Sequence, residues 1–166
     1  MKKIAALMVL FSIVVFAQQY GSFTDSRDGK RYQTVKIGTK TWMAENLNYN
    51  ENGSKCYENK SYNCQKYGRL YNWATAKAAC PNGWHLPGDN EWLAEGTDIL
   101  NYSALPGGAG YSYGDFQFVG DNGYWWSATG YDAAHAYSWL VYYGNAGAYS
   151  GRSDKSDLYS VRCVHD

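Results

Sequence analysis

The sequence lacks a run of apolar residues long enough to cross a bilayer as a helix, which takes about 20 residues. Its longest apolar stretch, residues 4–16, falls short of that length. None of the four cysteines forms a C-x-x-C pair, which argues against zinc-ribbon and thioredoxin-type sites. Neither sign of charge dominates, since 15 Lys and Arg balance 15 Asp and Glu without a basic run. Nucleic acid is therefore not an expected partner.

Candidate catalytic residues are sparse. No zinc-protease (H-E-x-x-H) or phosphate-loop (G-x-x-x-x-G-K) motif occurs. The three histidines, His85, His135 and His165, are far apart, and we expect His85 to be a buried structural residue beside a tryptophan. Glu91 and Glu95 are one helical turn apart and are expected on a solvated helix face. We expect no enzymatic activity and no cofactor.

The chain begins with the layout of a secretory signal. Lys2 and Lys3 precede the apolar stretch, and Val15 and Ala17 suit the −3 and −1 positions of a signal peptidase site. Cleavage after Ala17 would leave one domain over residues 18–166. No cysteine directly follows the apolar stretch, so a lipid anchor is not expected. We expect the mature protein outside the cell, at the cell surface or in the periplasm, without a membrane span.

The chain is rich in aromatic residues and glycine, with 17 Tyr, 7 Trp and 18 Gly. This composition is typical of short strands joined by tight turns, and Asp28-Gly29 is a hairpin signal. Gly96 is expected to weaken the helix that contains it. The expected elements are strands over 31–37 and 39–43, a loop over 48–67, helices over 70–79 and 89–100, a Gly-rich loop over 103–115, and strands over 123–129, 136–143 and 158–164.

Four cysteines in an exported chain predict two disulfides. Three connectivities are compatible with the four positions, Cys56, Cys64, Cys80 and Cys163. A loop as long as 48–67 is rarely unconstrained in a compact domain, and a Cys56–Cys64 bond would pin it. This argument favours the local pairing.

Four ordered motifs carry a family resemblance. They are T-W-M-A-E-N-L at 41–47, C-P-N-G-W-H-L-P at 80–87 followed by Glu91-Trp92, G-Y-W-W-S-A-T at 123–129 and S-V-R-C-V at 160–164. Together they resemble the Fibrobacter succinogenes major paralogous domain from about residue 23 to the C-terminus. Gly88 and Ala128 depart from the Ser or Thr usual at those positions. The resemblance carries no biochemical role.

The order of these motifs also resembles a C-type lectin domain. That resemblance implies an α+β fold with two helices against a twisted antiparallel sheet, a large loop region and two disulfides. It further implies that the cysteine after the first helix, Cys80, bonds to Cys163 in the last strand. C-type lectins bind calcium through Glu-Pro-Asn or Gln-Pro-Asp and Trp-Asn-Asp segments, none of which occurs here. We expect no bound metal and interpret the scattered carboxylates as solvated turn residues: Asp115, Asp121, Asp132 and Asp154.

Aromatic stacking on sugars needs no calcium. Four tyrosines lie in Gly-rich loops, where binding residues often occur, and they are the candidate ligand-binding residues: Tyr111, Tyr113, Tyr131 and Tyr149. The tryptophans of predicted strands and motifs are expected in the core instead: Trp42, Trp84, Trp125, Trp126 and Trp139.

One enzyme family has a similar pattern. His85-Leu86-Pro87 with Glu91-Trp92, and Arg162-Cys163, resemble segments of the sulfatase-modifying, formylglycine-generating enzymes. Those oxidases hold copper with two cysteines, whereas Leu158 occupies the position five before Cys163. The preferred hypothesis is a non-catalytic surface module that binds polysaccharide or a surface protein. The alternatives are a structural envelope domain without a small ligand and, less favoured, a sulfatase-modifying-type enzyme.

Overall fold

The strands form three antiparallel sheets in the described part of the computed structural model, which comprises residues 19–142, 144 and 147–166. The expected signal peptide, residues 1–17, lies outside these residues. The four-stranded sheet has the order β1 (Gln19–Thr24), β2 (Arg31–Ile37), β3 (Lys40–Met43), β9 (Val164–His165). The two-stranded sheet pairs β4 (Ala109–Gly110) with β5 (Phe116–Gln117), and the third has the order β6 (Asn122–Gly130), β7 (His135–Tyr142), β8 (Tyr149–Asp154).

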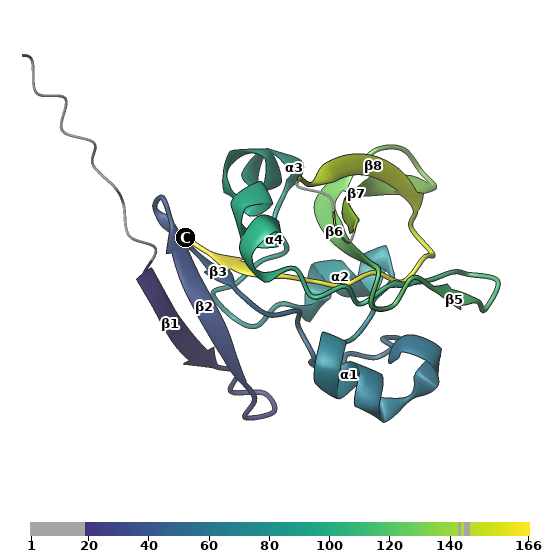
Figure 1. Ribbon diagram of the computed structural model, residues 1–166, viewed down its shortest axis with the longest axis horizontal. Helices are drawn as coiled ribbons and strands as arrows, with labels where there is room; N and C mark the ends of the chain where they lie inside the picture. The colour runs from purple at the N-terminus through teal and green to yellow at the C-terminus, as the bar shows by residue number, and fades with distance from the viewer. Residues whose placement is uncertain (1–18, 143, 145–146) are drawn as a thin grey trace, which may run out of the picture.

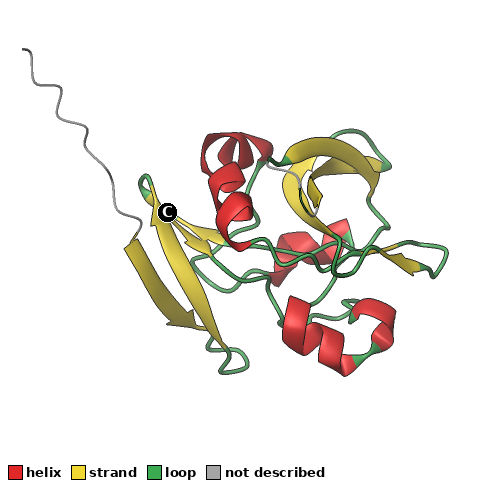
Figure 2. Ribbon diagram, viewed as in Figure 1, coloured by secondary structure: helices red, strands yellow, loops and turns green. Residues whose placement is uncertain are grey.

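Figures 1 and 2 show the four-stranded sheet at one end of the molecule and the β6–β7–β8 sheet at the other, with helices between them. The predicted α+β fold with antiparallel strands and two disulfides is confirmed. The single expected sheet is divided into three, and its likeness to C-type lectins stays a prediction. No helix of the described residues is long and apolar enough to cross a membrane.

The first sheet extends beyond its predicted hairpin. The hairpin of β2 and β3 is confirmed, with Ile37 opposite Lys40. No strand was predicted before residue 31, but residues 19–24 form β1, in register with β2 from Gln19↔Lys36 to Thr24↔Arg31. Asp28-Gly29 lies in the turn of this added hairpin. The exposed strand β1 has little apolar patterning, so only its pairing with β2 identifies it.

A short helix lies inside the segment predicted as a loop. Helix α1 (Ser61–Tyr67), preceded by the turn η1 (Tyr57–Asn59), occupies part of residues 48–67. The Cys56–Cys64 disulfide joins this helix to its own N-terminal approach, as predicted. On the chain-entropy model this short loop closure contributes about 2.5 kcal/mol.

Helix α2 (Trp73–Ala79) begins three residues later than predicted. Asn72 caps it, because the Asn72 side chain accepts a hydrogen bond from Thr75 N at 2.9 Å. Leu70 and Tyr71 instead pair in extended conformation with Lys55 and Tyr159. The helical spacing of apolar residues therefore extends to residues that precede the helix.

The second predicted helix continues to residue 103 as α3 (Asp89–Glu91), η2 (Trp92–Gly96) and α4 (Thr97–Ser103). Gly96 does not end it. A Cβ at this position would lie 2.2 Å from Cε3 of Trp92, so the glycine makes room for the indole in a π-helical turn. Gly96 thus allows the Trp92 ring to pack closely against the helix backbone.

The segment 158–164 is buried but is not one strand. Its residues pair in turn with different neighbours: Leu158 with Gly110, Tyr159 with Tyr71, Ser160 with Trp125, and Val164 with His85. It therefore connects the three-stranded sheet to the four-stranded sheet through the core. The predicted Cys80–Cys163 disulfide ties this segment to the end of α2 and contributes about 4.5 kcal/mol on the chain-entropy model.

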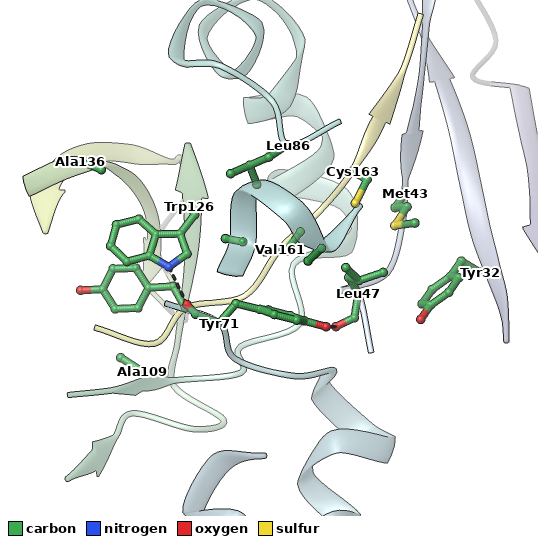
Figure 3. Close-up of a cluster of buried hydrophobic side chains, with 13 residues drawn as sticks. Tyr32, Met43, Leu47, Tyr71, Leu86, Ala109, Trp126, Ala136, Val161 and Cys163 are labelled. Atoms are coloured by element: carbon green, nitrogen blue, oxygen red, sulfur yellow. Dashed lines mark hydrogen bonds between the residues drawn. The ribbon is translucent and has the colours of Figure 1, made fainter. Parts of the chain in front are cut away.

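Tryptophans dominate the core, as predicted, together with several buried tyrosines. Trp42, Trp125 and Trp126 are fully buried, Trp139 is almost fully buried, and Trp84 packs at the margin. Figure 3 shows one cluster, in which Trp126 Nε1 donates to the carbonyl of Tyr71 at 2.7 Å. Each buried indole thus has a polar partner as well as apolar neighbours.

Candidate functional site

A groove of 490 Å³ lies on one face of the β6–β7–β8 sheet. Strand register places Tyr124, Leu140 and Tyr149 opposite one another, one on each strand, so their side chains share this face. Tyr142 lies one step along β7 on the same face and contacts Tyr149 edge to face at a ring distance of 5.8 Å. Tyr142 and Tyr149 are 42% and 49% exposed, which gives the groove two accessible aromatic surfaces.

Small residues hollow out the other end of the groove. Ser138 lies opposite Gly151, and a Cβ at Gly151 would meet only Ser138 Oγ, at 3.9 Å. The hydroxyls of Ser138 and Ser153 lie 2.8 Å apart and offer further donors and acceptors. Arg152 is the only charged residue among the described lining residues. The groove therefore combines aromatic rings with hydroxyl groups and has no carboxylate pair to hold a hard cation.

The four predicted tyrosines do not form one site. Tyr149 lies in the groove. Tyr111 and Tyr113 stack on each other in the β4–β5 hairpin, with ring centroids 5.3 Å apart, and Tyr113 is 70% exposed. Tyr131 follows β6 outside the groove; it is 44% exposed, and the Arg152 guanidinium lies 3.7 Å from its ring centroid. Only Tyr149 of the four therefore contributes to the groove.

Two groove residues were missed because they lie in strands. Tyr124 lies on β6 beside tryptophans that were expected in the core, and Tyr142 ends β7. Alternation along β7 puts Leu140 and Tyr142 on the face opposite Trp139 and Val141, which could have identified them. Residue 143, the last of the strand predicted over 136–143, lies outside the described residues.

A cluster of potential metal ligands lies at the other end of the molecule. Ligand atoms of His85, Glu91 and Asp166 are all within 4.8 Å of one another. The Lys40 ammonium lies among them, 2.7 Å from Glu91 and 2.5 Å from Asp166. Burial raises the pKa of Glu91, but hydrogen bonds from Lys40, Gly88 and His85 outweigh it and leave that pKa lowered. The Lys40 ammonium thus already supplies the positive charge that a metal ion would bring to these carboxylates.

These contacts correct two expectations. The His85 side chain is 41% exposed rather than buried, and its Nε2 lies 2.9 Å from Glu91. Glu91 and Glu95 are not a solvated pair. Glu91 completes a capping box with the backbone N–H of Gly88, and Glu95 accepts from Trp42 Nε1 at 3.0 Å. Both carboxylates hold helices in place.

Two of the scattered aspartates meet at a histidine. His135 Nδ1 lies 2.9 Å from Asp132, and Nε2 lies 3.2 Å from Asp154. Asp132 also accepts from the backbone N–H groups of Ala134 and His135, which is the hydrogen bonding of a turn residue. These hydrogen bonds, from the His135 side chain foremost, lower the pKa of Asp132. The turn interpretation holds for Asp132.

Sequence reasoning missed one enzyme-like pattern. Residues 110–114, G-Y-S-Y-G, fit the G-x-S-x-G pattern of serine hydrolases. In those enzymes the serine lies between a strand and a helix beside a histidine. Here Ser112 lies in the turn between β4 and β5, and the described hydrogen bonds of His85, His135 and His165 all go to other groups. The pentapeptide is a hairpin turn without a catalytic partner.

The cysteines offer no copper ligand pair either. All four form disulfides, and Leu158 packs in a small apolar cluster with Tyr57 and Leu70. A thiolate site of the sulfatase-modifying type would require reduction of the Cys80–Cys163 bond.

Comparison with protein families gives one match. The family model described as Fibrobacter succinogenes major domain matches residues 35–99, somewhat less than half of the chain. The matched range holds the first two of the four motifs, from β2 to α4, and ends before the groove. Neither curated proteins nor solved structures gave a match.

Proposed function

We propose that this chain, a member of the Fibrobacter succinogenes major domain family, is a non-catalytic module that binds polysaccharide in the groove of the β6–β7–β8 sheet. The observation that carries the proposal is the pair of half-exposed rings, Tyr142 and Tyr149, beside a hollow lined by serine hydroxyls. Flat aromatic faces stack on the apolar faces of sugar rings, and hydroxyls exchange hydrogen bonds with the sugar.

The scaffold suits such a role. Two disulfides and a tryptophan core hold the sheet, so the groove is formed before a ligand arrives. We place the mature protein outside the cell or at its surface, where disulfides form and polysaccharides are accessible. A surface protein as ligand, or a structural envelope role without a small ligand, are the competing functions.

The first test is a pull-down of the refolded mature domain on insoluble and soluble polysaccharides, with calcium and with chelator. We expect saturable binding that chelator leaves unchanged, because the groove has no set of carboxylates for calcium. Binding lost with chelator would contradict the groove as the site. No binding to any glycan would favour a protein partner or a structural role.

Variants then locate the site. Tyr149→Ala and Tyr142→Ala should each weaken polysaccharide binding about tenfold or more, since each removes a stacking surface. Gly151→Leu should fill the hollow and block binding without a clash in the free protein, because the space above Gly151 is open. Tyr62→Ala removes a tyrosine of α1 that is 58% exposed and is the matched control. Equal loss in the control would contradict the assignment.

A further inference from the structure

A second hollow, of 190 Å³, lies where the β1–β2 hairpin, the segment after β3 and helix α1 meet. It shares no lining residue with the groove. Three cationic side chains line it: Lys30 from the hairpin turn, Arg31 from the start of β2 and Lys66 from α1. We call this hollow the basic pocket. The hairpin and helix α1 thus bring positive charge together from positions more than 30 residues apart in the sequence.

The three cations retain capacity for a ligand. Arg31 donates through Nε to Ser22 Oγ at 2.9 Å, which uses one of the five N–H donors of a guanidinium. Lys66 lies over the ring of Tyr67, 4.8 Å from its centroid, and is exposed. Lys30 is more engaged, since its Nζ donates to Asn48 O at 2.5 Å and lies 3.3 Å from Asp28. Arg31 and Lys66 are therefore the main candidates for ligand contact.

One carboxylate, Glu45, also lines the basic pocket. It is turned toward the backbone, where Oε2 accepts from Gln33 N at 2.5 Å. Its neighbour Asn46 accepts a hydrogen bond from the buried Arg162 at 3.1 Å, so a further positive charge lies behind the pocket floor. With Lys30 paired to Asp28, the charges of Arg31 and Lys66 still exceed that of the anchored Glu45, which leaves the pocket with a positive field.

We propose that the basic pocket binds a carboxylate or sulfate group carried by an acidic saccharide. Guanidinium and ammonium groups are the strongest side-chain partners for such anions. Gln65 lines the same hollow, and its exposed amide suits sugar hydroxyls. The inference is independent of the groove and adds a second, charge-selective site to the chain.

The test is a titration of the ¹⁵N-labelled mature domain with trigalacturonic acid, with maltotriose as the neutral counterpart and sodium sulfate as the sulfate arm. We expect resonances around Arg31 and Lys66 to shift with trigalacturonic acid and not with maltotriose. Arg31→Gln/Lys66→Gln should weaken binding at least about fivefold, and added salt should weaken it further. Lys36→Gln, on the same strand but outside the pocket, is the matched control and should bind as the parent does.

The outcomes separate this site from the groove. Equal weakening in Lys36→Gln overturns the inference. So does the absence of any shift near the pocket up to about 10 mM ligand, because a single-site affinity of −4 kcal/mol would be visible at that concentration. A third result also overturns the inference: Tyr149→Ala abolishes the binding of trigalacturonic acid, and Arg31→Gln/Lys66→Gln leaves it intact. That result places the acidic saccharide in the groove. Shifts with sulfate alone would identify sulfate as the preferred group and support the pocket.

Discussion

The two faces of the β6–β7–β8 sheet carry different aromatic residues. On one face Trp125 and Trp139 lie opposite each other, buried, and their indole N–H groups donate to Asn46 Oδ1 at 2.8 Å and Asp89 Oδ1 at 2.9 Å. On the other face Tyr142 and Tyr149 are half-exposed at the groove. A buried indole needs a specific acceptor, whereas an exposed phenol finds its partner in water. Trp125 and Trp139 should therefore depend on these two acceptors, whereas the half-exposed tyrosines should tolerate change.

Asn46 is the residue on which the buried face depends most. Its side chain donates to the carbonyl of Tyr67 at 2.8 Å and accepts from both Trp125 and Arg162. Burial lowers the pKa of Arg162 to about 9, so this fully buried guanidinium is still charged at neutral pH. Removal of Asn46 would leave two buried donors without this acceptor, one of them charged.

We expect Asn46→Ala to lower the free energy of unfolding by about 3–5 kcal/mol, the largest effect predicted for a single substitution in this comparison. Urea denaturation followed by tryptophan fluorescence measures it. Asn48→Ala, two residues along, should change stability by less than about 0.5 kcal/mol, because no described hydrogen bond uses the Asn48 side chain. Similar losses in both variants would mean that the segment, rather than the Asn46 amide, matters.

Trp125→Phe should cost about 1–2 kcal/mol. The ring is replaced by a smaller one and the hydrogen bond to Asn46 is lost, but Asn46 Oδ1 still accepts from Arg162. The same urea measurement applies, and the double variant with Asn46→Ala should cost less than the sum of the two single changes. Strict additivity would show that the two residues do not share one network.

Tyr142→Ala and Tyr149→Ala should lower stability by no more than about 0.5 kcal/mol each, since the rings are half-exposed. A thermal melt beside the urea curve checks this. The comparison of faces would fail if either tyrosine variant destabilised the protein as much as Trp125→Phe. Loss of polysaccharide binding at unchanged stability would then separate ligand contact from folding.

The smallest expected effect is the loss of stability at acidic pH. Burial raises the pKa of Glu91, but its hydrogen bonds, led by that from Lys40, leave it below the ordinary value of 4.5. A lowered carboxyl pKa contributes stability that is present above about 4.5 and is lost as pH falls through the folded-state value. Glu91 neighbours Asp89, which accepts from Trp139, so acid should loosen α3 over the buried face.

We therefore expect Glu91→Gln to be less stable at neutral pH and to lose less stability between about pH 5 and pH 3 than the parent. Urea midpoints measured across this range test it. Asp25 also has a lowered pKa, because hydrogen bonds from Arg27 outweigh the effect of burial, so some acid sensitivity should persist in the variant. Parallel curves for variant and parent would contradict the role of Glu91.

The amino-acid sequence by itself determined the local elements and the covalent frame. Hydrophobic alternation and turn residues predicted β2, β3, β6 and β7. The long loop favoured the Cys56–Cys64 bond, and the motif order implied Cys80–Cys163. The tryptophans were assigned to the core for a sound reason, since large apolar rings are rarely left in water. These features depend on near neighbours or on patterns that repeat along the chain.

Tertiary structure alone decided the rest. Strand β1 exists because β2 offers it a pairing edge, and residues 158–164 pair with five residues from separate segments rather than with one strand. The groove arises from the register that aligns Tyr124, Leu140 and Tyr149, and the basic pocket from three elements that meet in space. Such sites depend on contacts between distant residues, which spacing along one chain does not encode.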